Sequence, residues 1–140
     1  MLQQTQVKTV IPYFKNFVKK IPDLITLSAT NYRRVLKLWE GLGYYRRARN
    51  LHKTAKILIK KYNGKLPKKF EEIKKLPGVG EYTARALLAF VYNQSHIPFD
   101  GNIKRVFSRL FNTNLEKNEK KIKRIINEQF YTNRNGDLAE

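Results

Sequence analysis

Apolar residues recur three or four positions apart in one segment after another of this 140-residue chain. In the opening segment, Val7, Val10, Ile11, Phe14 and Phe17 follow this spacing and polar residues fill the gaps. The spacing gathers apolar side chains on one face of an α-helix, whereas a β-strand would alternate them. Glycine, proline and asparagine interrupt the pattern repeatedly, which predicts short connections between helices. We therefore predict an all-α fold.

The breaks in the pattern give the expected helix boundaries. Asp23 and Asn31 are suited to cap two short helices, because their side chains can accept hydrogen bonds from first-turn amides. Asn63 followed by glycine is typical of a left-handed helix end. Helices are expected over residues 32–39, 44–62, 70–76, 81–93, 103–111 and 117–131.

Both ends of the chain fall within helical patterns. Leu2 already fits the spacing of the first helix, although no capping residue precedes it. The alternative is that Thr5 caps this helix and the first four residues fray. At the other end, residues 138–140 begin a helical pattern that does not continue. We expect one domain over residues 1–140, cut from a longer sequence at both ends.

Charge and composition limit the classes of molecule that the chain is expected to bind. The chain has 29 Lys and Arg against 11 Asp and Glu, a net charge of +18. This excess favours a polyanion partner, and the alternative is a lysine-rich surface that binds nothing. There is no cysteine, and the two histidines, His52 and His96, are isolated, so we expect no metal site and no thiolate chemistry.

Membrane association is not expected from the sequence. No apolar run approaches the ~20 residues of a membrane span. The first residues are polar, where a signal peptide would be apolar. We expect a monomeric cytoplasmic protein, associated with the nucleoid if it is bacterial.

The stretch LPGVG, residues 76–80, joins two expected helices. Gly78 and Gly80 lack a Cβ atom, so both can take a positive φ and allow close approach of another backbone. The amides of Val79 and of the following helix N-terminus would then be available to a phosphate group. A tight turn without a ligand is the alternative, because short glycine patterns are weak evidence alone.

Three longer stretches give a resemblance to a known family. They are MLQQTQVKTVIPYF, LWEGLGYYRRARNLHK, and LPGVGEYTA followed by FDGNIKRV. Together they resemble the adenine glycosylase branch of the helix-hairpin-helix endonuclease III superfamily over nearly the whole chain. The resemblance implies a six-helix barrel that carries the hairpin, with an incomplete second lobe. It also implies hydrolytic removal of adenine mispaired with 8-oxoguanine or guanine in double-stranded DNA.

The resemblance also implies a catalytic set, Asp100, Tyr82 and Asn102. A carboxylate at Asp100 would stabilise the positive charge that develops on the sugar as the base leaves, although an Asp at this position could also simply cap a turn. Tyr82 stands where the endonuclease III branch has a lysine nucleophile, and a phenol cannot form a Schiff base. Tyr82 and Asn102 would position the carboxylates, or they could be a buried hydroxyl and a helix cap.

The opening segment and the GLGYY loop would recognise the lesion. In the family, residues matching these lie in the minor groove, where Gln4 and Tyr44 replace lost stacking as the base flips out. Arg47 belongs to a basic helix face with Arg46, Arg49 and Lys53, expected to contact phosphates. The residues expected to bind DNA are Leu2, Gln3, Gln4, Thr5, Tyr44, Arg47, Gly78, Val79, Gly80 and Lys104.

The chain departs from the family pattern at its ends. The family's general acid is a Glu two residues before the position of Met1, and its iron–sulfur cysteines lie beyond the position of Glu140. We therefore expect no 4Fe-4S cluster within these residues, no 8-oxoguanine-reading domain, and impaired excision. The alternatives are a non-catalytic DNA-binding fragment, an endonuclease III-like glycosylase, or a basic helical domain without a role on DNA.

Overall fold

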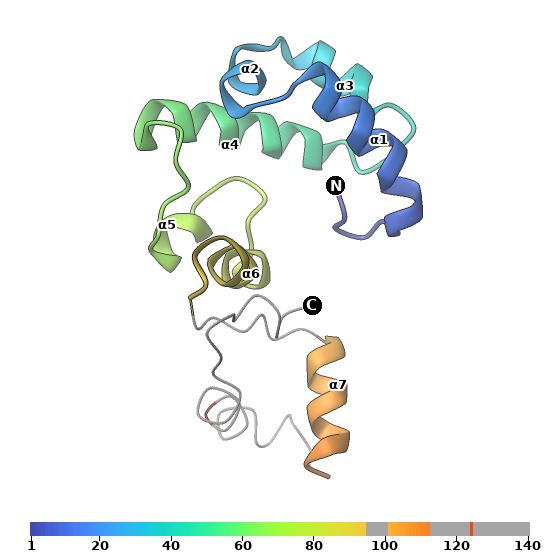
Figure 1. Ribbon diagram of the computed structural model, residues 1–140, viewed down its shortest axis with the longest axis vertical. Coiled ribbons are helices and arrows are strands. Elements are labelled where there is room, and N and C mark those ends of the chain that lie inside the picture. The colour runs from blue at the N-terminus through green and yellow to red at the C-terminus, as the bar shows by residue number, and fades with distance from the viewer. Residues whose placement is uncertain (95–100, 113–123, 125–140) are drawn as a thin grey trace. The chain divides into compact units, whose positions relative to one another are not determined.

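The computed structural model describes residues 1–94, 101–112 and 124. Every regular element in these residues is an α-helix, which confirms the predicted class. The helices are α1 (Val7–Lys20), α2 (Leu24–Ala29), α3 (Tyr32–Trp39), α4 (Arg46–Tyr62), α5 (Phe70–Lys74), α6 (Glu81–Tyr92) and α7 (Gly101–Leu110) (Figure 1). None of the described helices is long and apolar enough to cross a membrane. The helix predicted over residues 117–131 lies outside the described residues.

The chain forms two compact units. The first contains Met1–Pro67 and Lys75–Gly78, and the second contains Lys68–Lys74 and Val79–Glu140. The single domain expected over residues 1–140 stays a prediction.

The predicted helix caps of the first unit are present. The Asp23 carboxylate accepts a hydrogen bond of 2.7 Å from the Thr26 amide at the start of α2. The Asn31 side chain accepts one of 2.9 Å from the Arg33 amide at the start of α3. Asn63 ends α4 in the left-handed conformation, with φ 51°. Local side-chain chemistry therefore fixes where these helices begin and end.

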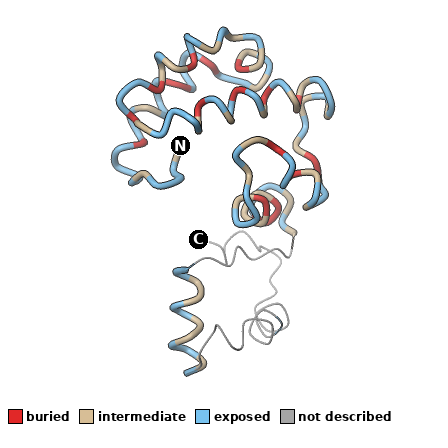
Figure 2. Tube along the Cα trace, turned by 180° about the vertical axis from the view of Figure 1, so that it is seen from behind, coloured by how far each residue is buried: buried red, intermediate tan, exposed pale blue. Residues whose placement is uncertain are grey.

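Helix α4 is the spine of the first unit, because α2 and α3 pack on it and α1 packs on α3. The buried residues of α4 recur every three or four positions: Ala48, His52, Ala55 and Leu58. Figure 2 draws buried residues in red, as separate bands along the trace. Trp39 lies fully buried at the end of α3 and meets the Phe17 ring of α1 edge to face, with centroids 6.1 Å apart. This core holds the N-terminal end of α4 and the loop before it in place.

The start of α1 differs from the expectation. The helix begins at Val7 after Gln6, which makes no side-chain capping bond, so neither a helical Leu2 nor a Thr5 cap is correct. Gln4 has φ 58°, a left-handed conformation that an α-helix cannot contain.

The apolar residues of α1 also do not form one buried face. Val10 and Phe17 are buried, whereas the other large apolar residues along the helix are exposed: Val7, Ile11, Phe14 and Val18. The spacing of three or four residues identified the helix correctly, but it did not identify which residues are buried.

In the second unit, α5 packs against α6. Ile73 of α5 and Leu88 of α6 are fully buried. The Arg85 guanidinium lies 5.1 Å from the centre of the Phe70 ring and forms a 3.0 Å ion pair with Glu81 one turn earlier. These interactions fix the first turns of α6, which follow the predicted hairpin.

Candidate nucleic-acid interface

The opening residues form a turn on which Leu2, Gln3 and Gln4 are exposed. The Thr5 amide donates a 3.2 Å hydrogen bond to the Leu2 carbonyl, which closes the turn around Gln3 and Gln4. Gln4 is exposed and Leu2 is 57% exposed. Thr5 is half-buried, and its hydroxyl has no hydrogen-bond partner. An exposed leucine and glutamine on a tight turn form a small protrusion.

The GLGYY loop forms a second protrusion in the same unit. Gly41, Gly43 and Tyr44 all have positive φ values, of 89°, 74° and 49°. The Tyr44 side chain is 60% exposed. The buried Trp39 indole anchors the loop by donating a 3.1 Å hydrogen bond to the Gly43 carbonyl. A bulky residue with positive φ is uncommon and needs support from its surroundings.

Arg47, in the first turn of α4, joins the two protrusions. Its Nη1 donates to the Met1 carbonyl at 2.5 Å and also to the Gln3 carbonyl. Its Nη2 lies 3.5 Å from the Leu42 carbonyl and 3.4 Å from the Gly43 carbonyl. One guanidinium thus binds backbone oxygens from two segments that lie far apart in the sequence.

The aromatic surroundings and burial of Arg47 complete this arrangement. Its guanidinium carbon lies 5.7 Å from the Trp39 ring centre and 5.2 Å from that of Tyr44. Burial lowers the pKa of Arg47, and the nearby Tyr44 opposes that change. Burial, and then the charge of Arg47, lower the pKa of the Met1 amine. The DNA contact expected of Arg47 stays a prediction, and its guanidinium is already engaged by the protein.

The hairpin residues of the first unit pack on α4. Gly78 has φ 78°, and a Cβ atom there would lie 2.6 Å from Asn50 Nδ2. The Thr54 hydroxyl donates a 3.2 Å hydrogen bond to the Pro77 carbonyl. Asn50 and Thr54 therefore pack against the turn and hold it on α4. Nothing in the sequence around these two residues predicts that role.

The two hairpin glycines differ in conformation. Gly80 precedes α6 with φ −86° and ψ −179°, which any residue can adopt, so the expected positive φ applies to Gly78 alone. Gly80 is the residue before the first turn of α6, and Val79 before it is half-buried. Phosphate binding by Val79 and Gly80 stays a prediction.

The expected catalytic residues lie in the second unit. Tyr82, in the first turn of α6, is 48% exposed, so it is not a buried hydroxyl. Asn102 lies inside α7 and accepts a hydrogen bond from Arg105, so it is not the helix cap. Lys104 is a half-buried residue of α7. Asp100 lies outside the described residues. Their catalytic and DNA-binding roles stay predictions.

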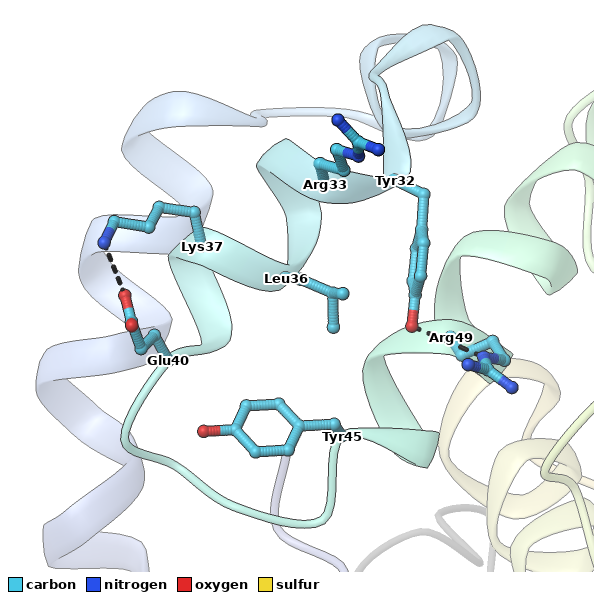
Figure 3. Close-up of a pocket in the computed structure, with 7 residues that line it drawn as sticks. All are labelled: Tyr32, Arg33, Leu36, Lys37, Glu40, Tyr45 and Arg49. Carbon is cyan, nitrogen blue, oxygen red and sulfur yellow. Dashed lines mark hydrogen bonds and ion pairs between the residues drawn. The ribbon is translucent and has the colours of Figure 1, made fainter.

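A basic and aromatic groove lies between α3 and the start of α4. It has two adjoining pockets of about 540 and 440 Å³ that share Tyr32, Tyr45 and Arg49. Figure 3 shows Leu36 pointing between the two tyrosine rings of the larger pocket. The Tyr32 hydroxyl accepts a 3.4 Å hydrogen bond from Arg49 Nε.

The basic residues predicted to form one helix face lie in two different places. Arg46, Arg49 and Lys53 line the smaller pocket, whereas Arg47 points to the opening turn. The one acidic side chain that lines either pocket, Glu40, is paired with Lys37 at 2.7 Å. The groove therefore keeps an excess of positive charge, which suits a phosphate backbone.

The chain offers no thiolate ligand, because it contains no cysteine, and so its own residues do not fit an iron–sulfur cluster. Within residues 1–94, 101–112 and 124, no cluster of three or more His, Asp or Glu could hold a metal ion.

Comparison with known protein families decides the affiliation. The model described as "HhH-GPD superfamily base excision DNA repair protein" matches residues 1–131. This chain belongs to the HhH-GPD superfamily. The match includes the opening turn, the GLGYY loop and the hairpin. The two protrusions and the contact of the hairpin with α4 are therefore parts of an HhH-GPD domain.

Several curated relatives of this HhH-GPD chain are named adenine DNA glycosylase. The protein from Buchnera aphidicola subsp. Baizongia pistaciae is 52% identical over 126 residues, which cover 90% of this chain and 35% of that protein. The human protein is 41% identical over 111 residues, which cover 79% of this chain and 20% of that protein. The chain thus spans about a third or less of the length of these relatives.

Solved structures support the HhH-GPD fold. A trapped endonuclease III–DNA covalent intermediate superposes with a TM-score of 0.76 at 24% identity, covering 99% of this chain and 64% of that chain. A thermostable thymine-DNA glycosylase gives 0.78 at 24% identity, covering 99% and 66%. At this identity the similarity shows the fold alone, and it confirms the predicted helix-hairpin-helix glycosylase fold.

Proposed function

We propose that this HhH-GPD domain belongs to an adenine DNA glycosylase that removes adenine mispaired with 8-oxoguanine or guanine. The observation that carries the proposal is the pair of exposed protrusions, Gln4 and Tyr44, held by Arg47 beside a net positive surface. A flat amide and an aromatic ring are suited to fill a base stack from which a partner has left. The 52% identity to a relative named adenine DNA glycosylase supports the same choice.

The mechanism proposed is hydrolysis without a covalent enzyme–sugar imine. Tyr82 stands in the first turn of α6, and its phenol cannot form a Schiff base with the sugar. Asp100 is the proposed carboxylate that stabilises positive charge on the sugar as adenine departs. This assignment disfavours the lyase chemistry of an endonuclease III-like enzyme.

The test is single-turnover release of adenine from a duplex containing one 8-oxoguanine:adenine pair, at low salt. Alkali treatment reveals abasic sites as strand breaks, and Asp100→Asn is the control variant. We expect slow, impaired release by the wild-type chain, which Asp100→Asn abolishes. Duplex binding without release by the wild-type chain would instead support the alternative, a non-catalytic DNA-binding fragment.

A further inference from the structure

Two residues that share an unusual backbone conformation lie in the two protrusions of the first unit. Gln4 has φ 58° and Tyr44 has φ 49°. A side-chain-bearing residue in this region costs free energy and persists only where its surroundings hold it. In both segments the surroundings include Arg47, which binds carbonyls that precede each residue: Met1 and Gln3 on one side, Leu42 and Gly43 on the other.

We propose that Arg47 is a positioning residue, which holds Gln4 and Tyr44 as a preformed pair for insertion into a DNA duplex. The inference rests on the proposed function, because that function supplies the duplex. It assigns Arg47 a role different from the phosphate contact expected from its place in a basic run.

The interactions of Arg47 suit this role better than a phosphate contact. Both terminal nitrogens are directed at backbone carbonyls, and the guanidinium also lies against the Trp39 and Tyr44 rings. Its Nε is buried without a hydrogen-bond partner, which is unfavourable for the free protein. Arg46 and Arg49, its neighbours in sequence, instead line the open groove.

Preorganisation is the physical benefit. Immobilising side chains and loops on binding opposes affinity, so a pair held in its bound geometry binds and opens a stack more readily. The planar fork of Arg can bridge two segments, whereas the ammonium of Lys is a point charge on a flexible stem. Arg47→Lys therefore keeps the charge and removes the bridge.

The first test needs no DNA. Amide hydrogen exchange of residues 2–7 is compared in the wild type, Arg47→Ala, Arg47→Lys and Arg46→Ala. We expect exchange at the Thr5 amide to rise about tenfold or more in both Arg47 variants, because they remove charge-assisted hydrogen bonds to the turn. Arg46→Ala should leave it unchanged. Unchanged exchange at Ala55 within α4 shows that the unit remains folded; unchanged exchange at Thr5 in Arg47→Ala would overturn the proposal.

The second test measures the insertion of Gln4 and Tyr44 into the duplex. The probe is a duplex with 2-aminopurine opposite 8-oxoguanine, whose fluorescence rises when the base leaves the stack. We expect Arg47→Lys to bind with the salt dependence of the wild type and to lose most of the fluorescence rise. The proposal would be overturned if Arg47→Lys gives the full fluorescence rise of the wild type and Arg47→Ala lowers the slope of log affinity against log salt by about one. Those two results together would identify Arg47 as a phosphate contact.

The two tests separate the inference from the function on which it rests. If the wild type neither binds the duplex nor changes the fluorescence, the proposed function fails. The exchange measurement then still decides whether Arg47 holds the opening turn.

Discussion

The side chain of Asn50 occupies the space beside Gly78 that a Cβ atom would need, with Nδ2 2.6 Å and Cβ 2.8 Å from that position. Because φ at Gly78 is also 78°, the turn of the hairpin depends on glycine for both its conformation and its packing. Helix α4 and the hairpin therefore constrain each other's sequence.

Replacing Gly78 by Ala should lower the free energy of unfolding by about 1–3 kcal/mol, from left-handed strain and the clash with Asn50. The measurement is urea unfolding followed by Trp39 fluorescence, since Trp39 is the only tryptophan and is buried in the same unit. Gly80→Ser is the control, because Gly80 has φ −86° and no atom near its Cβ position. Equal decreases in the two variants would contradict the assignment of Gly78.

The cap of α2 should make stability depend on pH in the acid range. Hydrogen bonds from Thr26, first from its amide and then from its side chain, lower the pKa of Asp23 below its ordinary value of 3.8. The unfolded state then binds the proton more readily, so the cap's contribution is present above pH 3.8 and is lost as the pH falls through the lowered pKa.

The variant Asp23→Asn keeps a capping oxygen without a titrating carboxylate. As the pH is lowered from about 6 to about 2, we expect the urea midpoint of the wild type to fall more than the urea midpoint of Asp23→Asn. A difference that stays constant with pH would show that the cap does not titrate with folding.

Trp39 should contribute to the position of the GLGYY loop through its indole N–H. The Trp39→Phe substitution removes the hydrogen bond to the Gly43 carbonyl and part of the core volume. We expect a decrease of about 1–3 kcal/mol in the free energy of unfolding, measured by circular dichroism in urea. Faster amide exchange at Tyr44 should accompany it, and a loop unaffected by Trp39→Phe would contradict the anchoring role.

The groove residues should account for part of the salt dependence of DNA binding. Replacing Arg46, Arg49 and Lys53 together by Ala should reduce the slope of log affinity against log salt by up to about 2.7, roughly 0.9 for each phosphate that the protein no longer neutralises. The matched control replaces Lys56, Lys60 and Lys61, which lie further along α4. It removes the same amount of positive charge. If both triple variants lower the slope equally, net charge rather than the groove governs binding.

Much of the secondary structure could be predicted because its signals are local. Asp23, Asn31 and Asn63 act on amides and carbonyls within a few residues, so their caps were predicted from sequence and are confirmed. The family resemblance was likewise carried by contiguous stretches, and the match over residues 1–131 confirms it. The helix predicted over 44–62 begins at Arg46, because Tyr44 has a left-handed backbone.

The sequence by itself determined the all-α class, most helix boundaries and the positions of the loops, since these depend on spacing, capping and turn chemistry. Only the tertiary structure decided which side of α4 each arginine faces, which apolar residues of α1 are buried, and that Gly78 packs on Asn50. These outcomes depend on interactions between segments distant in sequence. The Arg47 guanidinium reaches Met1 and Gln3 because the packing of α1 on α3 and of α3 on α4 brings the two segments together, and no local pattern encodes that distance.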